Sequence, residues 1–134
     1  MLSPTTYRRI YRASAWYDLL VTWPYATPLT LSMIWGMMGG VHAQFGFAPL
    51  PELNPMTVAF GNFFGTVVLL WSVLRLRLDQ PLLGRYDAVG RFAFAAWMIN
   101  ALMHGGSPVI WLFLIPEICW GIVQALPVRR FAAA

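Results

Sequence analysis

Charged residues are scarce in this chain of 134 residues, since they make up 10% of it and none of the nine basic residues is a lysine. A soluble domain carries about 25% charged residues. Hydrophobic residues make up 59% of the sequence, and so small a chain cannot bury that much apolar surface in one aqueous core. The composition therefore excludes an ordinary soluble domain and predicts an all-α integral membrane protein, with the lipid bilayer as its main partner.

Cysteines and polar linkers are also nearly absent. Cys119 is the only cysteine, so the chain can form no disulfide within itself. No linker divides the sequence, which indicates one transmembrane domain over residues 1–134. There is no nucleotide-binding loop and no metal-ligand spacing, so we expect no metal site, and the sequence leaves any cofactor unknown. The net charge of +4 comes from arginines beside apolar runs, a pattern that argues against nucleic acid as a partner.

Four apolar runs are present, at 19–38, 56–74, 92–103 and 109–126. A helix needs about 20 residues to cross the hydrocarbon core of a bilayer. The third run reaches this length only if it begins near Tyr86 and if Arg91 snorkels to the headgroups. We expect Pro24 and Pro28 to bend the first helix. The expected transmembrane helices are 16–38, 56–75, 86–104 and 108–126.

The arginines indicate the number of spans and their orientation. They precede the first run, surround the linker between the second and third runs, and follow the fourth: Arg8, Arg9, Arg12, Arg75, Arg77, Arg85, Arg91, Arg129 and Arg130. The other two linkers, 39–55 and 104–108, contain none. With four spans all arginines lie on one side, which the positive-inside rule assigns to the cytoplasm, whereas three spans would translocate the last pair. We therefore expect a four-helix bundle in a bacterial inner membrane with both termini cytoplasmic. A short interfacial helix that begins at Ser3-Pro4 should precede it.

Glu117 is the residue most informative about function. It lies near the middle of the fourth run, where a carboxyl is costly and is by default a functional hypothesis. Counting about 1.5 Å per residue places Asn62 and Thr66 at a similar depth. We expect these three residues to form an inner ligand-binding or proton-carrying site. The alternative is a polar seam that only holds the helices together.

Two further candidates, Asn100 and His104, share a face of the third expected helix but lie nearer the outer surface. Because His104 should stand about 12 Å from Glu117 in depth, we expect no direct pair between them. His42 and His104 are candidates to converge at the outer mouth of the bundle. As lone histidines they are more typical of interfacial hydrogen bonding than of metal ligation.

Two short patterns concern packing and charge. The Tyr-Asp pairs at 17–18 and 86–87 are 69 residues apart and indicate a faint repeat. We expect Asp18 and Asp87 to complement helix dipoles, and Asp87 to pair with Arg91 four residues later. We also expect Gly61 and Gly65 to face another helix, because small residues at this spacing allow close approach.

The stretches YDLLVT at 17–22 and GRYDAVGR at 84–91, with the four-helix size and the arginine-rich inner side, resemble the DoxX-like group of small bacterial membrane proteins. This resemblance is architectural, extends over most of the chain and implies a four-helix membrane bundle without any particular activity. Small multidrug transporters also have four helices and a crucial buried glutamate. Theirs lies in the first helix, so its role does not carry over to Glu117.

The leading functional hypothesis is a non-enzymatic helical bundle. It would associate with itself or with a larger membrane complex, or bind a hydrophobic small molecule. No nucleophile–base pair stands out in the sequence, so no catalytic residue is assigned. The alternative is a proton-coupled small-molecule transporter or a membrane-embedded enzyme that uses Glu117.

Overall fold

The structure is a computed structural model that describes residues 1–129. Within these residues the chain forms five α-helices and two short 3-10 turns, with no strand. The all-α class expected from the sequence is therefore confirmed. In chain order the elements are α1 (Pro4–Thr22), η1 (Trp23–Ala26), α2 (Pro28–Gln44), α3 (Pro55–Leu78), α4 (Pro81–Met103), η2 (Pro108–Ile110) and α5 (Trp111–Ala125).

Prolines mark where the helices begin. The first four helices each start at a proline, where the missing amide hydrogen costs nothing because the first turn has no partner for it. The residue before three of these prolines also caps the helix: the side chains of Ser3, Thr27 and Asn54 accept hydrogen bonds from backbone amides of the first turn. The expected start at Ser3-Pro4 is confirmed.

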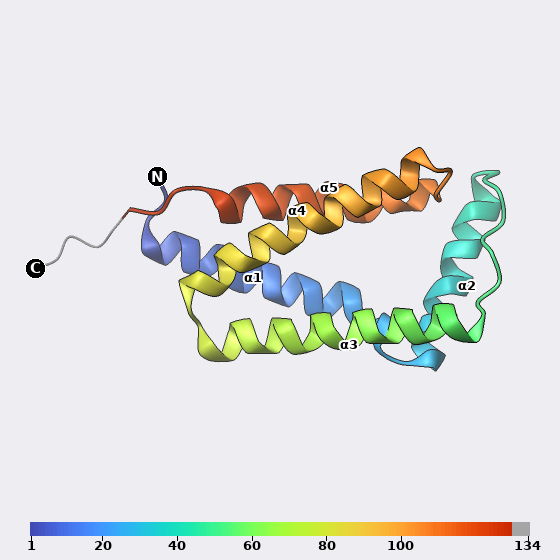
Figure 1. Ribbon diagram of the computed structural model, residues 1–134, viewed down its shortest axis with the longest axis horizontal. Helices are drawn as coiled ribbons and strands as arrows, with labels where there is room; N and C mark the ends of the chain where they lie inside the picture. Colours follow the sequence, from blue (N-terminus) through green and yellow to red (C-terminus); the bar gives the residue numbers. More distant parts are fainter. Residues whose placement is uncertain (130–134) are drawn as a thin grey trace, which may run out of the picture.

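The prediction of one helix over residues 16–38, preceded by a separate interfacial helix, is wrong. Residues Pro4 to Thr22 form the single helix α1, whose stripe at Tyr7, Tyr11 and Ser14 is buried inside the bundle. The chain then makes the turn η1 and starts α2 in a new direction, as Figure 1 shows. The two prolines in this stretch break the helix rather than bend it, because each lacks an amide hydrogen and crowds the preceding turn.

The helices expected at 56–75, 86–104 and 108–126 lie close to these positions, although α3 continues to Leu78 and α4 already begins at Pro81. Only Asp79 and Gln80 separate these two helices, and Asp79 ends α3 in the left-handed conformation with φ 51°. Its carboxylate accepts a hydrogen bond of 2.7 Å from Arg8 Nε and another from the Tyr11 hydroxyl. These hydrogen bonds hold the pKa of Asp79 well below its usual range, so the linker is anchored by an ionised carboxylate.

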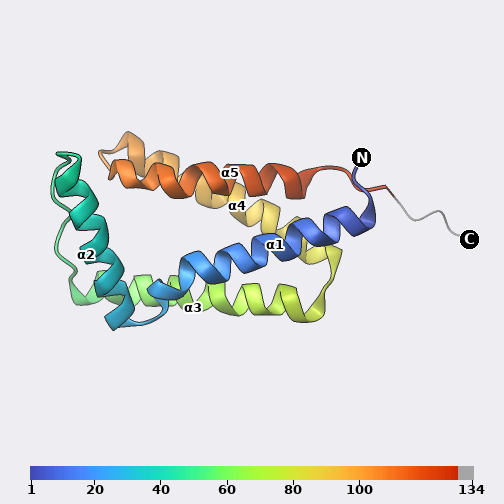
Figure 2. The same cartoon turned by 180° about the vertical axis from the view of Figure 1, so that it is seen from behind.

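The arrangement puts the N-terminus, the C-terminal end of α5 and the α3–α4 linker at one end of the molecule (Figure 1). The α2–α3 and α4–α5 loops lie at the other end. From their linker α3 and α4 diverge, α1 lies between them, and α2 stands across the far end, as the view from behind confirms (Figure 2). The Leu2 amide donates to Pro127 O at 2.8 Å and the Arg129 amide donates to Leu2 O at 2.9 Å, so the two ends form a terminal clasp.

The interior is more polar than that of a typical soluble domain. Among the described residues nine polar or charged side chains are buried, against eight apolar ones. Large apolar side chains such as Phe63, Leu70 and Trp97 are instead at least 65% exposed. Two stretches, Pro55–Leu78 and Pro108–Ala125, are long and apolar enough to cross a membrane.

Candidate functional site

Five charged side chains meet inside the bundle. They come from four helices: Asp18 from α1, Arg75 from α3, Asp87 and Arg91 from α4, and Glu117 from α5. We call these five residues the ionic cluster. An isolated buried charge is costly, so charges in such a place must compensate one another.

Arg75 is the most deeply buried member of the cluster, with no exposed surface. Its Nη1 donates to Asp87 Oδ2 at 2.5 Å and to Ser14 Oγ at 2.9 Å. Its Nη2 donates to Asp18 Oδ2 and, at 3.2 Å, to Ser72 Oγ. A single guanidinium thereby joins α1, α3 and α4 through a planar set of donors that lysine does not have.

Arg91 joins α4 to α1 and α5. Its Nε donates to Asp87 Oδ2 at 3.0 Å, its Nη2 to Asp18 Oδ2 at 2.7 Å and its Nη1 to Glu117 Oε2 at 2.9 Å. The expected pairing of Asp87 with Arg91 is confirmed. The expected snorkelling of Arg91 is wrong, because the side chain is only 3% exposed and finds three carboxylates inside the bundle.

Neutral groups complete the surroundings of the cluster. Trp71 Nε1 donates to the second oxygen of Asp87, Oδ1, at 2.8 Å. The Gln124 side chain donates to Ser14 Oγ, and the Tyr7 hydroxyl donates to Gln124 O at 3.1 Å. These contacts fix the positions of Asp87 and Ser14, so the cluster is held by α1, α3, α4 and α5 together.

The two aspartates of the faint Tyr-Asp repeat have a shared role that differs from the one expected. Asp18 and Asp87 each accept hydrogen bonds from both Arg75 and Arg91. Asp18 lies near the end of α1 rather than at its start, so the helix dipole would disfavour its charge there. Partner arginines, and not helix dipoles, therefore account for the position of these carboxylates.

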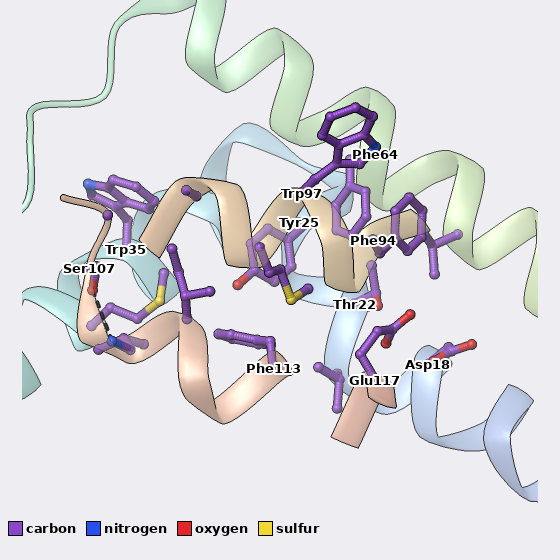
Figure 3. A pocket seen from close by; sticks show the side chains of 18 of the residues that line it. Asp18, Thr22, Tyr25, Trp35, Phe64, Phe94, Trp97, Ser107, Phe113 and Glu117 are labelled. Atoms are coloured by element: carbon purple, nitrogen blue, oxygen red, sulfur yellow. Dashed lines mark hydrogen bonds between the residues drawn. The ribbon is translucent and has the colours of Figure 1, made fainter. Parts of the chain in front are cut away.

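A cavity of about 1050 Å³ opens beside the ionic cluster. Four members of the ionic cluster line one of its ends, namely Asp18, Asp87, Arg91 and Glu117, and the loops 48–51 and 105–108 line the other. Figure 3 shows the two labelled carboxylates at one end and Ser107 at the other. Ligand sites typically measure about 300–1,000 Å³, so this cavity has the size of one for a substantial small molecule.

The walls between the two ends are apolar and rich in aromatic rings. Tyr25 of η1, Phe64 of α3, Phe94 and Trp97 of α4 and Phe113 of α5 all line the cavity (Figure 3). Two of these rings, Phe64 and Phe94, contact each other edge to face across the divergence of α3 and α4, with centroids 6.0 Å apart. The cavity thus combines a long hydrophobic section with a single charged end.

Asn62 and Thr66 were expected to share a site with Glu117, but the structure places neither of them beside it. Asn62 Nδ2 donates to Tyr25 O at 2.9 Å, Thr66 is exposed, and neither residue lines the cavity. The depth estimate did not determine which way each side chain points around the axis of α3. The residue that does meet Glu117 is Arg91.

The histidines do not converge. His42 is buried, with Nδ1 2.6 Å from Ala48 O and Nε2 2.5 Å from Ser107 Oγ, at the loop end of the cavity. His104 is exposed, lies 2.8 Å from Asn100 O through Nδ1, and does not line the cavity. Asn100 is exposed as well, so this pair has no contact with the ionic cluster.

Sequence reasoning missed Arg75 and Trp71, and it did not group the aspartates with the arginines. A usable signal was present on α1, where Tyr7, Tyr11, Ser14 and Asp18 follow helical spacing and form one polar stripe. Such a stripe in an apolar chain indicates buried polar partners. No protein-family model matches the sequence, and no curated protein or solved structure matches it either.

Proposed function

We propose that the protein is a multi-pass membrane protein with four crossings, both termini being cytoplasmic, and that its cavity holds a hydrophobic small molecule. In this topology α1, η1 and α2 together make the first crossing. Support for a membrane comes from the distribution of side chains: two arginines and two aspartates are buried inside the bundle, and many large apolar residues are exposed on the outside. Lipid favours this arrangement, because polar groups in it must be satisfied within the protein.

The orientation rests on the arginines. Arg8 and Arg12 reach Asp79 of the α3–α4 linker, and Arg129 lies in the terminal clasp, all at one end of the molecule. The loops at the other end contain no arginine. The positive-inside rule then favours a bacterial inner membrane with this end in the cytoplasm.

The topology predicts the side on which introduced cysteines react. In a Cys119→Ala background, we expect Glu52→Cys and His104→Cys to react with a membrane-impermeant thiol reagent in intact spheroplasts. Arg77→Cys should react only after the membrane is permeabilised. All three positions are exposed, so access to reagent differs only by side. Labelling of Arg77→Cys in intact cells with neither loop labelled would invert the orientation.

The observation that carries the proposal of ligand binding is the cavity itself. Close packing stabilises a protein interior, so a bundle that binds no ligand is expected to fill its interior with side chains. A cavity lined by aromatic rings that ends at the ionic cluster is instead the form of a ligand site. The divergence of α3 from α4 places aromatic side chains of both helices along the cavity, where they can contact an apolar ligand. We also propose, from size and arginine distribution alone, that the chain is kin to the DoxX-like group.

Filling the cavity should remove binding without disturbing the fold. Gly90 lines the cavity, and a Cβ at this position would meet nothing within 4 Å. We expect Gly90→Phe to lower saturable binding of tritiated 6-phenylhexylamine and 6-phenylhexan-1-ol in lipid nanodiscs at least tenfold, because the ring takes the space of the ligand. Mass spectrometry of the purified wild type should also find a co-purifying apolar molecule that Gly90→Phe lacks.

The matched control is Gly36→Phe on α2, which has equally open surroundings but does not line the cavity. Its binding should equal that of the wild type. If the wild type has neither saturable binding of the two probes nor a co-purifying molecule, the cavity is not a ligand site.

The second candidate function is a proton-coupled transporter or a membrane-embedded enzyme that uses Glu117. It is favoured by the position of this carboxyl on the cavity wall, where Arg91 is its one salt-bridge partner among residues 1–129. Acidification inside liposomes that accompanies probe uptake, and is lost in Glu117→Gln, would support the transporter. Self-association or membership of a larger complex remains a further proposal, for which the open faces at Gly36 and Gly40 leave room.

A further inference from the structure

The charges of the ionic cluster do not balance. It contains three carboxyl groups, from Asp18, Asp87 and Glu117, and two guanidinium groups, from Arg75 and Arg91. With every group ionised, one negative charge is left over. In a low-dielectric interior a surplus charge is stabilised by a further cation or removed by a proton.

The surplus charge lies on the side of the cluster that faces the cavity. Arg75 is fully buried and does not line the cavity. Asp87 does line it, but both of its oxygens are occupied, by the two arginines and by Trp71. Asp18 and Glu117 line the cavity and retain 11% and 13% of their side-chain surface. These two carboxyl groups are therefore the ones that a ligand in the cavity can reach.

Each of these two carboxyl groups also has an oxygen that accepts no hydrogen bond from residues 1–129. All the hydrogen bonds that the described residues give to Asp18 reach Oδ2, and the one given to Glu117 reaches Oε2. Asp18 Oδ1 and Glu117 Oε1 accept none. Because Nη2 and Nη1 of the same Arg91 guanidinium hold the two groups, they lie side by side at the charged end of the cavity (Figure 3).

We infer that the ligand of the cavity is a lipophilic amine, bound as its monocation with the ammonium group between Asp18 and Glu117. This inference rests on the proposed ligand-binding function and specifies the class of ligand. An ammonium group supplies the missing positive charge and up to three hydrogen-bond donors for the two free oxygens. The aromatic walls suit the apolar tail and add attraction for a cation that passes their faces.

The test compares two probes that differ only in the head group. 6-Phenylhexylamine is protonated at pH 7, whereas 6-phenylhexan-1-ol has the same tail and no charge. In nanodiscs of uncharged phosphatidylcholine, we expect the wild type to bind the amine at least tenfold more tightly than the alcohol, measured as saturable binding of the tritiated compounds. In Glu117→Gln the shape is kept and the surplus charge is gone, so this preference should fall at least tenfold.

The outcomes separate the two proposals. If the wild type binds the alcohol as tightly as the amine, or if Glu117→Gln keeps the full preference for the amine, the cavity is a ligand site but not one for amines. The comparison of probes on the wild type needs no variant, so it decides the matter even if Glu117→Gln fails to fold. If neither probe binds saturably and no small molecule co-purifies, the proposed function itself fails.

Discussion

Replacing Arg75 by methionine should prevent accumulation of the folded protein. Arg75 has no exposed surface and donates to Asp18, Asp87, Ser14 and Ser72. Its loss leaves three carboxyl groups with the single guanidinium of Arg91. Breaking a buried ion pair by removing one partner costs about 3–5 kcal/mol, a large part of the stability of a small protein. The measurement is the yield of monodisperse protein in detergent and its thermal unfolding temperature.

Arg77→Met is the matched control, because Arg77 lies two residues later on the same helix and is exposed. Its yield and unfolding temperature should remain close to those of the wild type. An Arg75→Met protein as stable as Arg77→Met would show that the cluster contributes little to folding and that its arginines are dispensable there.

Adding one methyl group at Gly65 should destabilise the protein by about 3 kcal/mol, at the upper end of the usual cost of overpacking. A Cβ built on Gly65 would lie 2.5 Å from Tyr25 C and 2.6 Å from Ala26 N, which are backbone atoms of η1. Backbone atoms cannot rotate away as a side chain can, so α3 and η1 must separate. Gly65→Ala should therefore lower the unfolding temperature sharply in detergent.

Gly61→Ala provides the comparison on the same face of α3. There the added Cβ would meet only the side chain of Leu31, with Cδ2 at 2.8 Å, and this flexible end can move. We expect a loss below about 1 kcal/mol. Equal losses at the two positions would mean that the approach of η1 to α3 is not what requires glycine at 65. The sequence-based expectation that Gly61 and Gly65 face another helix is confirmed, because Gly61 meets Leu31 of α2 and Gly65 meets the 3-10 helix η1.

The sequence predicted local features well. The start at Ser3-Pro4 and the Asp87–Arg91 pair depend on residues within one or two helical turns of each other. The approximate bounds of the three later helices follow from continuous apolar runs. The break at η1 was underestimated, because one proline can kink a transmembrane helix, and the sequence alone did not show that Pro24 and Pro28 together would redirect the chain.

The candidate site was only partly predictable. Glu117 was found because a carboxyl in an apolar run is conspicuous, and it does lie at the cavity. Arg75 and Arg91 were interpreted as cytoplasmic surface charges, because the positive-inside rule counts each arginine without its partner. Their partner Asp18 is 57 and 73 residues away in the chain. Such a pairing depends on how the helices rotate and diverge, and the periodicity of one sequence does not determine that.

The terminal clasp has a consequence for biogenesis. Of the five described helices, α1 is synthesised first. It holds Asp18, whose arginines follow on α3 and α4, and Tyr7, whose acceptor Gln124 is close to the end of α5. Leu2 pairs with Pro127 and Arg129, which are synthesised after all five helices. In the proposed membrane topology, Asp18 meets its arginines once α3 and α4 are made, whereas Tyr7 and Ser14 must wait for Gln124 of α5. Truncated chains that stop before α5 should therefore remain substrates for membrane quality-control proteases, because the contacts of Gln124 with α1 cannot form.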